Sequence, residues 1–237
     1  MNRRFTNVIR FFLDECLPPL LRDNRFFMYP FFWLAYRGRN VRETMEFKSR
    51  VLNFTPAEYQ QFYAQLDSIS RNRATDLNPA CLAAILGALD DKVTSLLDAG
   101  CGSGYLLKRI HEAHPRIALT GSDIVPAPPD LPGRYYQGEL TDMQPEEGSF
   151  DVVTCSHVLE HILDLKAAVR TLRSLSRKLV VIVVPCQRYY YYTLDEHVHF
   201  FTHEHQIYSL MGLEREVVLD CRKLDGDWFL LVRGYDA

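Results

Sequence analysis

The stretch "LLDAGCGSGYLL", residues 96–107, constrains the fold more than any other part of the chain. It joins a short apolar run, typical of a buried strand, to a segment with helical spacing. Three glycines stand between them at alternate positions: Gly100, Gly102 and Gly104. Because glycine permits positive φ angles and close approach of the backbone to a ligand, this turn predicts a nucleotide-type binding element.

The second half of the chain alternates between strand and helix patterns. From residue 93 onward, short apolar runs alternate with helical segments, and "LVVIVVP" suits a central strand buried on both faces. The last 25 residues, 213–237, predict two strands joined by a turn at Asp225 and Gly226. We therefore expect residues 91–237 to form a Rossmann-like, doubly wound α/β domain of seven strands that ends in an antiparallel hairpin.

Residues 1–90 predict a helical arm or lid that precedes this domain. Thr55, followed by a proline and then Glu58, forms a capping box, which predicts a helix start. Asn78 followed by Pro79 predicts a second helix start.

Overall composition narrows the class of protein. The net charge is −3, which argues against nucleic acid as a partner. Six cysteines are scattered without a CxxC pair, as in a reducing compartment, and no apolar run is long enough for a membrane span. The first 19 residues lack the pattern of a signal peptide. These features predict a cytoplasmic protein.

Charge and aromatic residues are concentrated in residues 1–50. This segment has ten Arg and Lys against five Asp and Glu, a balance of +5, so residues 51–237 carry −8. It also holds eleven Phe, Tyr and Trp residues, interleaved with basic residues that include Arg22, Arg25, Arg37 and Arg39. Such a composition suits peripheral contact with an anionic membrane at its inner face. A lid with buried aromatics and a dimer contact, which would make the protein a homodimer, remain open as alternatives.

An acid, Asp98, stands at the mouth of the glycine turn. The spacing G-x-G-x-G differs from the G-x-G-x-x-G of NAD sites, and a carboxylate there would repel a pyrophosphate. S-adenosylmethionine (SAM) carries a cationic amino group and a sulfonium but no phosphate, so it suits this acid. An NAD-linked oxidoreductase is thereby disfavoured, whereas a non-catalytic SAM-binding or interaction module stays open.

The glycine turn resembles the first motif of the class I SAM-dependent methyltransferases. The resemblance extends over residues 91–237, through "TGSDIV", "QGELTDM", "GSFDVVTCSHVLEHI" and "HVHFFT". It implies SAM as cofactor, S-adenosylhomocysteine as product and a ribose-binding acid at the end of the second strand. The cofactor-binding residues implied are Asp98, Gly100, Cys101, Gly102, Gly104, Asp123, Ile124, Glu139, Leu140 and Ser156.

The fourth-strand motif bears on the acceptor. The sequence there is "CSHV" rather than an "NPPY"-like stretch, which argues against a nucleic-acid amino-methyltransferase and favours the small-molecule branch with transfer to oxygen. Methyl transfer to a hydroxyl requires loss of a proton, and histidine is the natural base. The candidates are His157, His197 and His199, with Asp195 to orient one of the imidazoles. The histidine-rich stretch also allows metal ligation, but we expect no metal, since catalytic metals of this fold favour carboxylates.

The stretch "PCQRYYYYTLD" offers groups for a sugar-like acceptor. Tyr190 and Tyr192 present flat faces and hydroxyls, Arg188 could pair with a phosphate, and His199 would line the same site. The alternative is that the tyrosines simply continue the preceding strand. The arm also resembles, more weakly, those of methyltransferases encoded with bacterial surface-polysaccharide genes. That resemblance implies polysaccharide biosynthesis and a sugar acceptor carried on a polyprenyl-phosphate lipid.

Overall fold

The computed structural model describes residues 12–65, 74–143 and 150–235. The chain forms two compact units, and each is described by itself. The sheet unit comprises residues 74–187 and 199–237, and the helical unit comprises residues 1–73 and 188–198.

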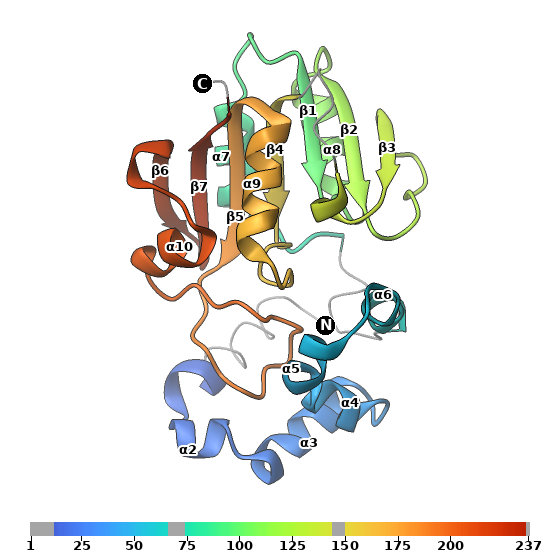
Figure 1. The fold of residues 1–237 in the computed structure, drawn as a ribbon, viewed down its shortest axis with the longest axis vertical. Helices are drawn as coiled ribbons and strands as arrows, with labels where there is room; N and C mark the ends of the chain where they lie inside the picture. The colour runs from blue at the N-terminus through green and yellow to red at the C-terminus, as the bar shows by residue number, and fades with distance from the viewer. Residues whose placement is uncertain (1–11, 66–73, 144–149, 236–237) are drawn as a thin grey trace. The chain divides into compact units, whose positions relative to one another are not determined.

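The sheet unit is built on seven strands in the order β3-β2-β1-β4-β5-β7-β6 (Figure 1). All neighbouring pairs are parallel except β5–β7 and β6–β7, which are antiparallel. This confirms the predicted Rossmann-like sheet with an antiparallel C-terminal hairpin. The strands are β1 Ser95–Ala99, β2 Ala118–Asp123, β3 Arg134–Gln137, β4 Phe150–Ser156, β5 Ser176–Pro185, β6 Val218–Leu224 and β7 Asp227–Arg233.

Helices cover both faces of this sheet. In Figure 1, α9 lies in front of the strands, and α7 and α8 lie behind them. Val180 and Ile182 of β5 belong to the core shared with α9 and α10, and Val181 and Val183 to the core shared with α7 and α8. Both faces of β5 are therefore buried, which is the physical reason for its continuous β-branched run. The helices are α7 Pro79–Ala88, α8 Tyr105–Ala113, α9 Leu165–Leu175 and α10 Glu204–Met211, with short 3₁₀ turns at Leu140–Asp142 and Arg215–Val217.

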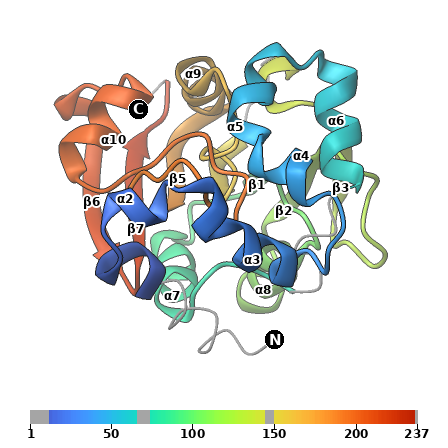
Figure 2. The same cartoon turned by 90° about the horizontal axis from the view of Figure 1, so that it is seen from below.

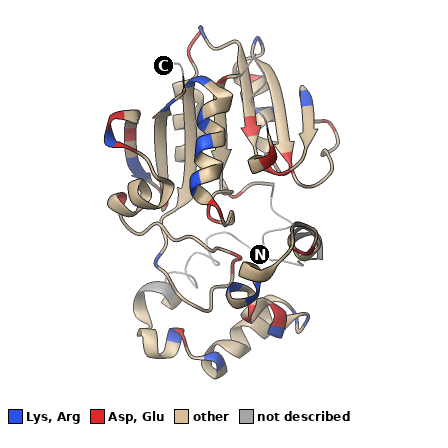
Figure 3. Ribbon diagram, viewed as in Figure 1, with Lys and Arg blue, Asp and Glu red and all other residues tan. Residues whose placement is uncertain are grey.

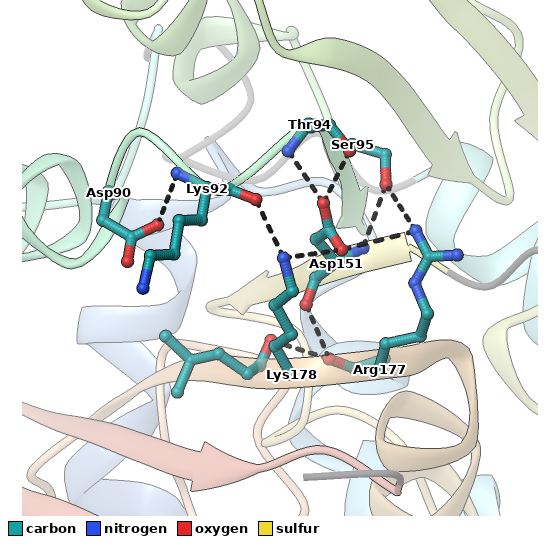
Figure 4. A network of polar contacts seen from close by, with 9 residues as sticks. Asp90, Lys92, Thr94, Ser95, Asp151, Arg177 and Lys178 are labelled. Atoms are coloured by element: carbon teal, nitrogen blue, oxygen red, sulfur yellow. Dashed lines mark hydrogen bonds and ion pairs between the residues drawn. The ribbon is translucent and has the colours of Figure 1, made fainter.

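A polar network ties together the amino ends of β1, β4 and β5 (Figure 4). Asp151, at the start of β4, accepts from the backbone nitrogen and the hydroxyl of Thr94 at 2.8 and 2.7 Å. Its other oxygen lies 3.3 Å from Arg177 Nη2 and 3.1 Å from Lys178 Nζ. Burial would raise the pKa of Asp151, but these hydrogen bonds and cations outweigh it and hold the pKa well below the usual range.

The helical unit has its own small core, and Figure 2 shows its helices α2 to α6 from a second direction. The core gathers Met28, Phe32, Tyr36, Val41 and Met45. The predicted capping box is confirmed at the start of α6: Glu58 Oε2 accepts from the Thr55 nitrogen at 2.8 Å, and the Glu58 nitrogen donates to the Thr55 hydroxyl oxygen at 3.3 Å. The elements are a π-helical turn Phe12–Cys16, α2 Pro19–Arg22, α3 Arg25–Ala35, α4 Val41–Met45, α5 Phe47–Arg50, a 3₁₀ turn Val51–Asn53 and α6 Pro56–Gln65.

The units divide at residue 73 rather than at the expected residue 90. Asn78 caps α7 by accepting from the Cys81 nitrogen at 2.8 Å, as its sequence pattern predicts. Its side-chain amide also donates to the Leu224 carbonyl at 2.9 Å and to Asp227 Oδ2 at 2.8 Å. These bonds tie α7 to the β6–β7 hairpin and hence to the sheet unit.

The segment 188–198 packs with the N-terminal helices and contains no strand. The interpretation of the tyrosine run as a strand continuation is therefore wrong: β5 ends at Pro185. Arg22, expected as a surface cation, is only 2% exposed. Its guanidinium lies 4.8 Å from the Tyr190 ring centre and donates to the Tyr192 carbonyl. Among the described residues, each helix lacks the length and apolarity needed to cross a membrane.

Candidate active site

The glycine loop between β1 and α8 has φ angles of +75° at Gly100, +50° at Gly102 and +72° at Gly104. A Cβ atom at Gly100 would lie 2.2 Å from Val158, and one at Gly104 would lie 2.5 Å from Leu131. A Cβ atom at Gly102 would meet nothing within 4 Å. The outer two glycines are thus required by packing, whereas Gly102 borders open space that a ligand can approach.

Asp123 lies beside this loop because β2 pairs with β1 and both strands end at the same edge of the sheet. Its Oδ2 accepts from the Gly102 nitrogen at 2.8 Å, and its Oδ1 accepts from the Val125 nitrogen at 3.3 Å. The next residue, Ile124, is half-buried, and its carbonyl accepts from Gln137 at 3.3 Å. An acid held at this position can accept hydrogen bonds from a ribose diol.

Asp98, near the end of β1, is 2% exposed, and its Oδ1 accepts from the hydroxyl of Thr154 at 2.7 Å. Burial raises the pKa of Asp98 to about 7, although the Thr154 hydrogen bond opposes that shift. A cationic group placed beside this carboxyl would favour its ionised form. The sequence did not single out Thr154, because its place opposite Asp98 depends on the register between β1 and β4.

The remaining expected cofactor residues lie along the same edge. Cys101 is buried, and burial with the nearby acids raises its pKa to about 12, so it is a neutral thiol. Glu139 precedes the 3₁₀ turn that begins at Leu140, whose side chain packs on the core shared with α9. Ser156 is the last residue of β4.

This set of groups fits SAM. It combines two carboxyl groups, a loop with open space at Gly102 and the carboxyl edge of three adjacent parallel strands. Neither acid would favour a pyrophosphate. The order of acids and loop along the edge is the one that the sequence resemblance implied.

Comparisons with known proteins agree with this geometry. The family described as a methyltransferase domain matches residues 62–215, which is more than half of the chain. The ubiquinone biosynthesis O-methyltransferase of Xanthomonas axonopodis pv. citri (strain 306) is 31% identical over 110 residues, covering 42% of this chain and 45% of that protein. The chain thus spans less than half the length of the curated relatives it matches.

Two solved structures share the fold. The mitomycin 7-O-methyltransferase MmcR has a TM-score of 0.55 at 14% identity, over 92% of this chain and 74% of that chain. The plantazolicin methyltransferase BpumL, in complex with a monoazolic desmethylPZN analogue and SAH, has a TM-score of 0.54 at 14% identity, over 81% of this chain and 98% of that chain. The chain belongs to the methyltransferase-domain family.

His157, at the edge of β4, lies between two acids: Glu160, three residues further along the chain, and Asp227, which begins β7. Its Nδ1 lies 3.5 Å from Glu160 Oε1, and its Nε2 lies 3.4 Å from Asp227 Oδ2. Burial lowers the pKa of His157, but the two nearby acids outweigh burial and raise the pKa to about 10. Near neutral pH this imidazole is therefore a cation, with no free nitrogen to take a proton.

The other expected catalytic and acceptor residues divide between the two units. His199 belongs to the sheet unit, where its Nε2 donates to the Ile162 carbonyl at 2.9 Å. His197 belongs to the helical unit and is 7% exposed, and its Nδ1 lies 3.5 Å from Asp195 Oδ2, which is the pairing that the sequence suggested. Arg188, exposed, Tyr190, buried, and Tyr192, half-buried, also belong to the helical unit.

Proposed function

We propose that this protein transfers the methyl group of SAM to a hydroxyl of a small or sugar-like acceptor, including one carried on a lipid. The observation that carries the proposal is the cradle formed by Asp98, Gly102 and Asp123, which suits a cationic ligand with a ribose. Transfer to oxygen is supported by the curated relatives, which are named as O-methyltransferases. The sugar-like acceptor is supported by the aromatic and basic composition of residues 188–192.

When bound, SAM supplies a methyl group already activated on a sulfonium. The protein's part is to orient the cofactor, align the acceptor oxygen and remove its proton. In the proposed roles, Asp123 holds the ribose and Asp98 faces the amino-acid end.

We assign the general base to His197 rather than His157. Asp195 beside Nδ1 of His197 favours the tautomer with a proton on that nitrogen, in which Nε2 is the basic nitrogen. His157 is already protonated near neutral pH and cannot serve as a base. Arg188, which is exposed, would contact a phosphate on the acceptor.

Labelled SAM should be incubated with a panel of phenols, sugar nucleotides and glycolipids, and transfer measured for wild type and variants. We expect His197→Ala to lower kcat by ~10²–10⁴ while SAM affinity stays near that of wild type. His205→Ala, at an exposed position on α10, is the matched control and should leave kcat unchanged. SAM binding without transfer to any hydroxyl would instead favour a non-catalytic SAM-binding module.

A further inference from the structure

One helix of the helical unit is apolar on both sides, yet among the described residues its own unit covers only one of these sides. Met28 and Phe32 of α3 are fully buried in the unit's core. Phe26, Tyr29 and Trp33 are 87%, 48% and 54% exposed. Their spacing of three, four and seven residues places them along one line of the helix, which we call the α3 outer face.

This exposure is unusual in extent. Single exposed apolar side chains are common on any protein, but here three aromatic residues form a row on a helix of 11 residues. Residues 26–36 contain no charged side chain that could solvate the row. We expect such a face to bind a partner that buries its apolar side chains.

Basic residues stand at both ends of the row. Arg25 precedes it, and its guanidinium is within 3.1 Å of Glu46. Arg37 and Arg39 follow it, and both are exposed. In Figure 3, the Lys and Arg residues of this region lie at the ends of α3, with none along its middle. An apolar row flanked by cations is complementary to an anionic lipid surface, in which acyl chains lie beneath charged headgroups.

Two further features favour a hydrated lipid interface over a second copy of this chain. Pro30, within α3, has no N–H to donate to the Phe26 carbonyl, so that carbonyl needs a donor such as water. The headgroup region supplies water, whereas a dry protein interface does not. Two antiparallel copies of the face would also bring Arg25 of each copy near Arg37 of the other, which is repulsive.

We propose that the α3 outer face binds anionic membrane surfaces, with Phe26, Tyr29 and Trp33 among the headgroups and the flanking arginines on lipid phosphates. Tyrosine and tryptophan suit this depth because each joins an apolar ring to a polar tip. The proposal rests on α3 alone and does not depend on which acceptor is methylated.

The test is sedimentation of the full chain with vesicles of phosphatidylcholine, with and without phosphatidylglycerol. We expect binding to the anionic vesicles at low salt and weaker binding as salt rises. Phe26→Ala with Trp33→Ala should weaken binding by ~10- to 100-fold, since both side chains lose apolar burial. Arg37→Gln with Arg39→Gln should weaken it by about 30-fold at low salt, from ~1 kcal/mol per basic residue.

The matched control is Lys166→Gln with Arg170→Gln on α9, an exposed basic stripe visible in Figure 3. It removes the same charge and should change binding by less than about threefold. SAM affinity and Tm, measured on every variant, confirm that each one folds. The proposal is overturned if wild type stays in the supernatant at low salt, if the Phe26 and Trp33 variant binds as well as wild type, or if light scattering shows that these substitutions dissociate a dimer.

Discussion

Asp98 and Asp151 are two buried acids on neighbouring strands, and their surroundings give them opposite properties. Asp151, at the amino end of β4, receives the nitrogen and hydroxyl of Thr94 and the cations of Arg177 and Lys178. Asp98, near the carboxyl end of β1, accepts from the hydroxyl of Thr154. The pKa of Asp151 is held well below its usual range, whereas burial raises that of Asp98 to about 7.

At opposite edges of the same sheet, one buried acid stabilises the fold and the other is available to a ligand. At the amino edge, the protein supplies the partners that an ionised carboxylate needs, so the charge stabilises the fold. At the carboxyl edge, the charge is costly until a cationic ligand arrives, as at many functional sites. This contrast predicts four outcomes, which follow in order of decreasing expected effect.

The largest effect is expected at the amino edge. Asp151→Asn should lower the free energy of unfolding at pH 7 by about 2–4 kcal/mol, because the cations lose their partner. The folded pKa of Asp151 lies below the unfolded one, so its contribution is present above about pH 4 and is lost as pH falls through the folded pKa. Urea denaturation at pH 7 and at pH 3 measures both, with the exposed Asp91→Asn as control. Equal losses at the two pH values would contradict the assignment.

At the carboxyl edge, we expect Gly100 to be required for packing and Gly102 to be required for ligand binding. Gly100→Ala should destabilise the fold by about 2–3 kcal/mol, because its Cβ would overlap Val158 at a positive φ. Gly102→Ala has space for its Cβ and should cost about 1 kcal/mol or less, yet weaken SAM binding. Thermal unfolding and calorimetry of both variants make the comparison. A larger loss of stability at Gly102 than at Gly100 would refute it.

Asp123→Ala should weaken SAM binding by about 1–3 kcal/mol, the cost of leaving hydrogen-bonding groups unpaired. The stability of this variant should change less than that of Asp151→Asn, since we propose that Asp123 binds the ligand. Isothermal titration with SAM and with NAD tests both binding and cofactor choice. Unchanged SAM affinity, or NAD binding as tightly as SAM, would overturn the ribose assignment; Asp142→Asn, at an exposed position, is the control.

The smallest change in stability is expected at Asp98, where substitution should raise stability rather than lower it. A folded pKa raised to about 7 means that the stability linked to this carboxyl is present below about pH 4 and is lost as pH rises through 7. Asp98→Asn should therefore raise stability at pH 8 by ~1–2 kcal/mol while weakening SAM binding. In wild type, SAM affinity should rise as pH increases from 6 to 8. A flat pH profile for wild-type SAM affinity, or a loss of stability at pH 8 in the Asp98→Asn variant, would show that Asp98 is paired like Asp151.

Much of the fold followed from local patterns. The strand, glycine and helix succession, the capping residues Thr55 and Asn78 and the Asp-Gly turn at Asp225 each act over a few neighbouring residues. The β-branched run of β5 predicted a strand buried on both faces, which the structure confirms. The acids Asp98 and Asp123 could be proposed for the cofactor because each lies at or near the end of a strand, where parallel sheets gather their ligand-binding groups.

The sequence by itself therefore determined the class of fold, the order of its elements and the cofactor edge. Tertiary structure decided what burial and register control: Thr154 opposite Asp98, Asp227 beside His157, and the burial of Arg22 against Tyr190. It also decided that residues 188–198 join the N-terminal helices rather than extend β5. Each of these depends on residues far apart along the chain. Such distant neighbours set the charge state of a side chain and its exposure, and no local sequence pattern encodes them.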